Sequence, residues 1–270
     1  MTKNGDRQAV AEAIECKLST DADAGMRALR EATPGASEEF ARDLLAVAWR
    51  QGQASSDTRL RRQLVGYLLG VLHDGTPFLR TQALKFLQDF SSGDFDAQAR
   101  TRLQEIPLEG EDAAGIVRLI GIAGVRSRQE ELQRLAGTGF QTSGSALYAG
   151  VPWAACLALA RMGDASCLQR IVEKTAQERD LIVRTTQLFA DLAYTRQPAA
   201  FDALRGYLRS DARLPQLKDT VPGASEALYA AAAIAGHVEG SPVAEKDLRE
   251  EDVTTVRRWA ESQRGWRIKD

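Results

Sequence analysis

The stretch LRTQALKFLQDF, residues 79–90, places apolar side chains at positions 79, 83, 84, 86, 87 and 90. This spacing is typical of an amphipathic helix with a wide buried face. Pro77 stands just before it, where a missing backbone N–H costs nothing at a helix start. Similar segments begin near residues 40, 117, 151, 183 and 224, so that the six starts lie 32 to 41 residues apart. Self-similarity at such a period predicts a helical repeat architecture.

A second helix is expected after each of these segments. The expected second helices are Thr58–His73, Asp96–Ile106, Gln129–Ala136, Cys167–Thr175, Pro198–Arg209 and Ala244–Glu250. A single helical hairpin cannot bury its apolar face, so neighbouring hairpins must stack. Helices pack 8–10 Å apart, so six hairpins would form an arc on the order of 50–60 Å, with the second helices on its concave side. We therefore expect one all-α domain over residues 1–270, with repeats in 36–240, capping helices in 1–35, and a cap and tail in 241–270.

The composition agrees with a helical protein. The chain has 42 Ala and 30 Leu but only 14 Val and 9 Ile, a bias toward helix formers over strand formers. Its longest apolar stretches, 151–160 and 227–235, are half of the roughly 20 residues that a membrane span needs. The net charge is −2, and the start of the sequence shows no apolar leader, so a cytoplasmic location is expected. The three cysteines form no C-x-x-C pair and are expected to be small buried thiols.

Two segments resemble the repeated helix of a known family. LRTQALKFLQDF (79–90) and VPWAACLALARMGD (151–164) are similar to the V-R-x-x-A-A-x-A-L-x-x-L-G-D pattern of HEAT repeats, including the short bacterial repeats related to phycobilisome lyases. The resemblance covers roughly residues 35–240. It implies an α-α superhelix, a HEAT-like solenoid of about six hairpins plus capping helices.

The same resemblance implies a ladder of polar contacts between successive repeats. HEAT repeats often carry an acid six positions before an arginine. The matching pairs here are Asp74 with Arg80, Asp112 with Arg118, and Glu178 with Arg184. The repeat at 151 has Ala146 and Pro152 at these positions, and the repeat at 224 has Asp219 but Ser225.

Residues that would carry catalysis are scarce. The two histidines, His73 and His237, both fall at expected helix ends, where a cation complements the helix dipole. Metal-ligand motifs and a phosphate-binding glycine loop are absent from the sequence. Acid pairs occur at 38–39, 111–112, 130–131 and 250–252, near helix starts where they stabilise exposed N–H groups. The sequence predicts a protein without catalytic residues, cofactor or metal.

A partner surface is predicted on the middle repeats. Trp153, Leu157 and Phe189, together with Leu119, occupy positions of the repeat that should face away from each hairpin's own core, with Arg161 as a polar neighbour. Large exposed apolar residues mark interaction sites, and Trp is enriched at binding hot spots. The alternative is that these side chains form core between adjacent repeats. A second candidate is Phe140, in the loop GTGFQTSG at 137–144.

The expected function is therefore non-enzymatic binding of another protein or peptide, as a scaffold, adaptor, regulatory subunit or inhibitor of the immunity type. One alternative is a HEAT-like DNA glycosylase, because basic clusters occur at 59–62, at 126–128 and in the Arg/Trp-containing tail 257–267. The chain is acidic overall and offers no alignable catalytic Asp, which disfavours nucleic acid. A second alternative is a lyase or chaperone for a tetrapyrrole carrier, implied only by the resemblance.

Overall fold

The computed structural model describes residues 3–138, 150–215 and 223–270, and in these ranges the chain is all-α, as predicted. The only β-type pairing among the described residues is two isolated bridges, Arg213 with Ser225 and Val238 with Ile268. The chain divides into two compact units, Met1–Arg128 and Gln129–Asp270. The boundaries predicted at residues 35 and 240 do not coincide with this division, and the single domain stays a prediction.

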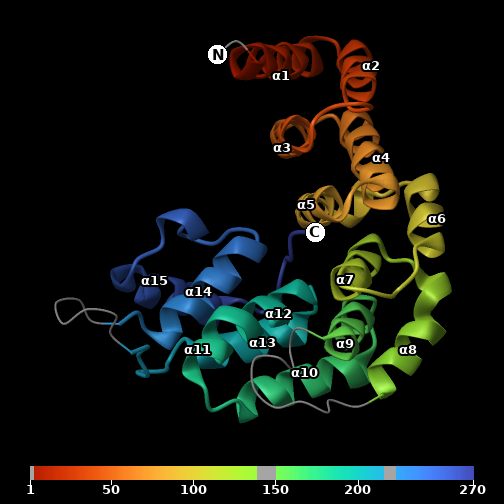
Figure 1. Ribbon diagram of the computed structural model, residues 1–270. Coiled ribbons are helices and arrows are strands. Elements are labelled where there is room, and N and C mark those ends of the chain that lie inside the picture. Colours follow the sequence, from red (N-terminus) through yellow and green to blue (C-terminus); the bar gives the residue numbers. More distant parts are fainter. Residues whose placement is uncertain (1–2, 139–149, 216–222) are drawn as a thin grey trace. The chain divides into compact units, whose positions relative to one another are not determined.

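The N-terminal unit is built from two layers of helices. Its helices are α1 (Lys3–Thr20), α2 (Ala22–Ala32), α3 (Glu38–Ala54), α4 (Thr58–Asp74), α5 (Pro77–Leu87), α6 (Ala97–Glu105) and α7 (Ala113–Ala123), with 3-10 turns at Ser92–Asp94 and Arg126–Arg128. Helices α1, α3, α5 and α7 each contact the next in one layer, and α2, α4 and α6 do so in the other (Figure 1). The expected helix of residues 79–90 is α5, and the expected helix Thr58–His73 is α4.

Local sequence signals set the ends of these helices. The Asp57 carboxylate accepts a hydrogen bond from the Arg59 backbone N–H at 2.8 Å and begins α4. Thr76 is the N-cap of α5, and Pro77 occupies its first turn. Asp96 begins α6 by accepting from the backbone N–H of Ala99 at 2.8 Å. Each cap satisfies a donor that would otherwise be left unpaired at a helix start.

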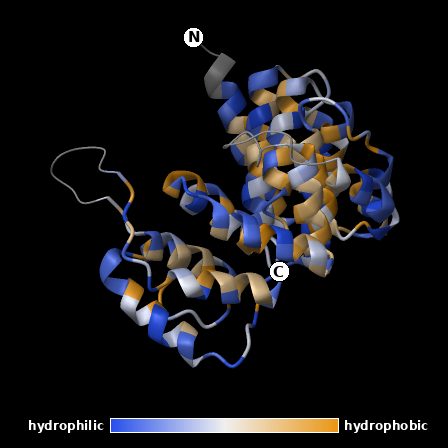
Figure 2. Ribbon diagram, turned by 90° about the horizontal axis from the view of Figure 1, so that it is seen from below, coloured by the Kyte–Doolittle hydropathy of each residue, from blue (hydrophilic) through white to orange (hydrophobic). Residues whose placement is uncertain are grey.

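The C-terminal unit has a similar layered arrangement. Its helices are α8 (Gln129–Gly137), α9 (Val151–Arg161), α10 (Ala165–Gln177), α11 (Leu181–Val183), a π-helical stretch at Arg184–Leu188, α12 (Phe189–Tyr194), α13 (Pro198–Tyr207), α14 (Glu226–His237) and α15 (Val253–Ser262). Helices α9, α12 and α14 contact one another in sequence, as do α10, α13 and α15. In Figure 2, hydrophobic residues alternate with hydrophilic ones along the helices, as amphipathic packing requires.

One expected helix is wrong. The segment Ala244–Glu250 contains no α-helix, and the region instead has two short 3-10 turns, Glu245–Asp247 and Glu250–Asp252. Leu248 is the only large apolar residue in the segment, and it is only partly buried. Without an apolar stripe the segment has no face to bury, so neighbouring structure does not stabilise a helix there.

Candidate binding groove in the N-terminal unit

The described part of the N-terminal unit contains a cavity of about 1100 Å³ on the layer formed by α2, α4 and α6. Helix α4 lines it from Arg59 to Asp74, which corresponds to about 22 Å along the helix axis. Residues at the end of α2 and in the turn after it form one wall, and the first turns of α6 form the other. We call this cavity the α4 groove.

Two glycines of α4, Gly66 and Gly70, line the groove. They are four residues apart and therefore lie on the same face of the helix, one turn from each other. A Cβ atom added to Gly66 would meet nothing within 4 Å, and one added to Gly70 would meet only the Arg102 guanidinium, at 3.8 Å. This face of α4 therefore carries no side chain of its own at these two positions, and the exposed Arg102 side chain of α6 lies over it.

Other glycines of the same unit are explained by packing within the chain. A Cβ on Gly25 would lie 2.5 Å from the Leu18 backbone, one on Gly52 would lie 2.4 Å from the Phe90 ring, and one on Gly115 would lie 2.4 Å from Leu84. These three glycines permit close approach of neighbouring elements. No such neighbour explains Gly66 and Gly70, although each lowers the stability of a helix interior relative to alanine.

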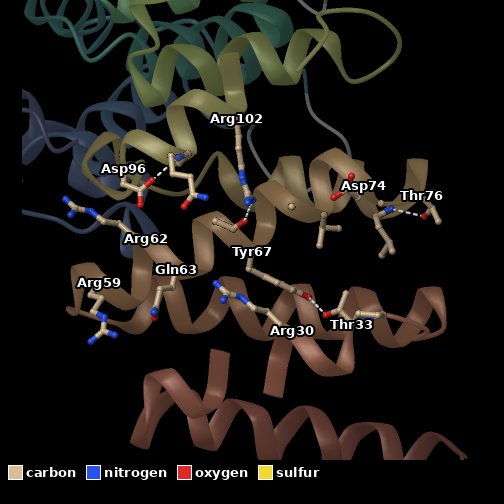
Figure 3. Close-up of a pocket in the computed structure, with 18 of the residues that line it drawn as sticks. Arg30, Thr33, Arg59, Arg62, Gln63, Tyr67, Asp74, Thr76, Asp96 and Arg102 are labelled. Atoms are coloured by element: carbon tan, nitrogen blue, oxygen red, sulfur yellow. Dashed lines mark hydrogen bonds between the residues drawn. The ribbon is translucent and has the colours of Figure 1, made fainter. Parts of the chain in front are cut away.

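The groove is positively charged along most of its length. Arg30 from α2, Arg59 and Arg62 from α4, and Arg102 from α6 line it, against Asp74 and Asp96, an excess of two positive charges in a chain whose net charge is −2. All four arginines are exposed, but the Arg59 guanidinium is already paired with the Asp23 carboxylate at 3.0 Å. Figure 3 shows Arg59, Arg62 and Gln63 toward one end of the groove and Asp74 toward the other.

Hydrogen bonds hold several lining side chains in place. Arg102 donates to the Gly66 carbonyl at 3.2 Å, and Arg62 donates to the Gly93 carbonyl at 3.2 Å. The Thr33 hydroxyl donates to the Leu29 carbonyl, so the Tyr67 hydroxyl donates to Thr33, over 2.9 Å. Burial raises the pKa of Tyr67, which keeps its phenol protonated.

Gln63 adds an unused acceptor to the groove lining. Its amide nitrogen donates to Asp23 at 3.3 Å. Its Oε1 atom is buried and has no hydrogen-bond partner among the described residues. A buried acceptor without a donor is unfavourable, and this atom lies beneath the surface of the groove.

The predicted apolar surface on the middle repeats is wrong. Trp153 and Leu157 are fully buried, Phe189 is 1% exposed, and Leu119, in the other unit, is buried too. The Trp153 indole donates to the Asp191 carboxylate of α12 at 2.7 Å. The face of α9 that was expected to meet solvent therefore packs against the next helix of its own layer. The alternative interpretation, core between adjacent repeats, describes these residues.

Arg161, the expected polar neighbour of that surface, is also withdrawn from solvent. Its side chain is 8% exposed, donates to the Tyr194 carbonyl at 2.6 Å, and pairs with Asp270 at 3.2 Å. Phe140 and most of the loop 137–144 lie outside the described residues. Arg161 is therefore not part of an exposed surface, and the prediction for Phe140 stays a prediction.

Some residues of the expected ladder pair across neighbouring helices of one layer. Arg80 of α5 contacts Asp112, at the start of α7, at 3.3 Å. Arg184 pairs with Glu226, at the start of α14, and also donates to the Glu178 carbonyl at 2.6 Å. Asp219 lies outside the described residues. Asp74 lies against its neighbour His73 at 2.6 Å, and Arg118 belongs to α7.

The histidines and cysteines differ in their surroundings. His73 and His237 lie in the last turns of α4 and α14, as predicted. Burial, with Arg196, Lys269 and Arg161 nearby, lowers the pKa of His237 to about 4, so its expected role as a cation at the helix end is wrong near neutral pH. Cys156 and Cys167 are buried as expected, but Cys16 is exposed.

The C-terminal tail folds onto its own unit. The Trp266 indole donates to Asp202 at 3.0 Å, and its ring lies near Phe201 and Trp259, with the Arg205 guanidinium 5.5 Å from its centroid. Ile268 pairs with Val238. Trp259 and Trp266 therefore pack within their own unit, whereas the tail arginines Arg258, Arg264 and Arg267 are exposed.

Two findings concern the described residues as a whole. Within residues 3–138, 150–215 and 223–270, no group of three or more His, Cys, Asp or Glu side chains is placed to hold a metal ion. Over the same ranges, no helix is both long and apolar enough to cross a membrane.

Sequence reasoning found the groove only in part. The basic cluster 59–62 was visible, and two of its arginines, Arg59 and Arg62, line the groove, whereas Arg61 pairs with the buried Asp94. The contributions of Arg30 and Arg102 come from helices distant in sequence. The available signal was the pair of glycines four residues apart inside an otherwise strong helix.

The chain was compared with known proteins. Neither the protein-family models, nor the curated proteins, nor the solved structures gave a match.

Proposed function

We propose that this chain is a HEAT-like helical-repeat protein that binds another protein without catalysing a reaction, as a scaffold, adaptor, regulatory subunit or inhibitor. The observation that carries the proposal is the α4 groove, a cavity of about 1100 Å³ with two glycines on its floor and arginines on both walls. A surface of this size and shape suits recognition of a segment of another macromolecule.

The layered contacts support the repeat part of the proposal. In each unit, every second helix contacts the next one of its layer, which is how stacked hairpins bury their apolar faces. The ion pair Arg80–Asp112 links α5 with the start of α7, and Arg184–Glu226 links the π-helical stretch before α12 with the start of α14. Both arginines occupy the second position of their repeated segment. Proteins built in this way generally use the surface of one helix layer for binding.

The glycosylase alternative would need a carboxylate at the floor of the basic surface. The α4 groove has two acids, but Asp96 caps α6 and Asp74 has a side chain that is 81% exposed. The floor between the arginines consists of Gly66, Gly70 and the hydrogen-bonded Tyr67. Protein binding is therefore the function that this groove supports better.

The test is affinity capture from the native cell, followed by quantitative identification of the bound proteins. The bait is compared with Gly66→Leu/Gly70→Leu, which fills the groove, and with Gly206→Leu, the same change on α13, where an added Cβ also meets nothing within 4 Å. The proposal predicts a protein that the wild type and Gly206→Leu retain and that the filled variant loses at least tenfold. Equal recovery by the folded filled variant would refute it.

A further inference from the structure

We propose that the occupant of the α4 groove is an acidic α-helix of a partner protein, lying along α4 with its carboxylates toward the arginines. This inference rests on the proposed function and specifies the chemistry of the partner. Three features of the groove support it: its length, its glycine floor and the distribution of its charges.

The length and walls of the groove match one helix. The lining of α4 extends for about 22 Å, which corresponds to about four turns of an α-helix. Helices α2 and α6 both contact α4 and flank it. A helix lying over α4 between these two walls would contact all three helices of the layer.

The glycine floor allows a close approach. The distance between packed helix axes is 8–10 Å and depends on the side chains at the contact. With Gly66 and Gly70 on one face of α4, a helix that displaces the exposed Arg102 side chain from above them can approach to the short end of this range.

The charges select an acidic occupant with a defined polarity. Arg62 lies near the N-terminal end of α4, while Arg30 and Arg102 reach the groove from opposite walls. Arg59, beside Arg62, is already paired with Asp23 and does not enter this argument. Arginine binds carboxylates through paired, charge-assisted hydrogen bonds. Asp74 lies toward the other end, so acids are expected over the arginines and none opposite Asp74.

Nucleic acid fits these features less well. Asp74 and Asp96 would lie beside a continuous line of phosphates, which repel carboxylates. A helix can instead place its acids at chosen positions, over the arginines and away from these two carboxylates. The groove therefore matches a surface of mixed charge better than one of uniform charge.

The test is a display library of random 20-residue peptides selected on the full-length protein. Each selected peptide is then measured by fluorescence anisotropy against the wild type, the filled variant Gly66→Leu/Gly70→Leu, the groove variant Arg30→Glu and the control Arg42→Glu. Arg42 lies on α3, in the other layer of the same unit, and is also exposed. The control thus changes the net charge equally outside the groove.

The proposal predicts peptides with Asp or Glu at i, i+3 and i+4 spacing. Their affinity should fall about tenfold with Arg30→Glu, fall more than a hundredfold with the filled variant, and change less than twofold with Arg42→Glu. A proline in the middle of the peptide should abolish binding, because it breaks a helix. Retention of fold in each variant is checked by circular dichroism.

Other outcomes separate the two proposals. Peptides that need the groove but show no enrichment of acids, or tolerate the central proline, would overturn the acidic helix and leave protein binding intact. A duplex DNA of 20 base pairs that binds the groove more tightly than any peptide would also overturn the acidic helix. Peptides that bind the filled variant as well as the wild type would refute both proposals.

Discussion

Replacing Gly66 or Gly70 of α4 by alanine should make the chain more stable, although the added side chain partly covers the floor of the groove. Gly66 and Gly70 lie inside a 17-residue helix, and an alanine Cβ at either site meets open space or an ordinary contact. Alanine is favoured over glycine in a helix interior by about 1 kcal/mol. We therefore expect Gly66→Ala and Gly70→Ala each to raise the free energy of unfolding by about 1 kcal/mol.

The matched control is Gly52→Ala, in the neighbouring helix α3. Its Cβ would lie 2.4 Å from the ring of Phe90, which is 3% exposed. Overpacking of this kind costs about 1–3 kcal/mol, so this variant should be less stable than the wild type. The same substitution thus has opposite signs at two sites on adjacent helices.

The assay is urea denaturation followed by far-ultraviolet circular dichroism, with the midpoint compared at constant slope. The reasoning is refuted if Gly66→Ala and Gly70→Ala destabilise the protein as Gly52→Ala does. In that case the chain's own packing would require both glycines, and the glycine floor of the groove would give no information about a partner.

Two further predictions concern the C-terminal unit. Trp153→Phe removes the indole donor to the nearly fully buried Asp191 and should lower the free energy of unfolding, measured in urea, by about 2 kcal/mol or more. Trp49→Phe removes an exposed 2.9 Å hydrogen bond to Asp89 and should lower it by less. Equal losses would contradict the importance assigned to the buried bond. The pKa of His237 is about 4 in the folded chain against 6.5 ordinarily, so the unfolded state binds more protons between these values, and stability falls as the pH drops from 6.5 toward 4. This pH dependence of the free energy of unfolding amounts to about 3 kcal/mol at most. The variant His237→Gln should lose it, and the control His73→Gln should keep it. An unchanged pH profile in His237→Gln would show that another group is responsible.

The helical class could be predicted from sequence because apolar spacing is a local property. Residues 79–90 show the full pattern, and α5 forms where it predicts, with Thr76 and Pro77 at its start. The segment 244–250 lacks an apolar stripe and was assigned by its position in the repeat alone, and there the prediction failed. The reliable signal was therefore periodicity within a segment, not the regularity of the repeat.

The binding surface was harder to predict because exposure depends on neighbours that are distant in sequence. The same helical spacing places Trp153 either toward solvent or toward the next helix of its layer, and only packing against Asp191 of α12 decides between them. The α4 groove combines Arg30, Arg62 and Arg102 from three helices. A sequence shows each arginine but not that the three share one cavity.

The most direct test of the central claim is site-specific photo-crosslinking to the captured protein. A benzophenone side chain is placed at Gln98, which lines the α4 groove, or at Gln104, which is exposed on the same helix but outside the groove. Binding in the groove predicts a crosslink to the partner from position 98 and none above background from position 104. A crosslink from position 104 with none from position 98 would contradict binding in the groove.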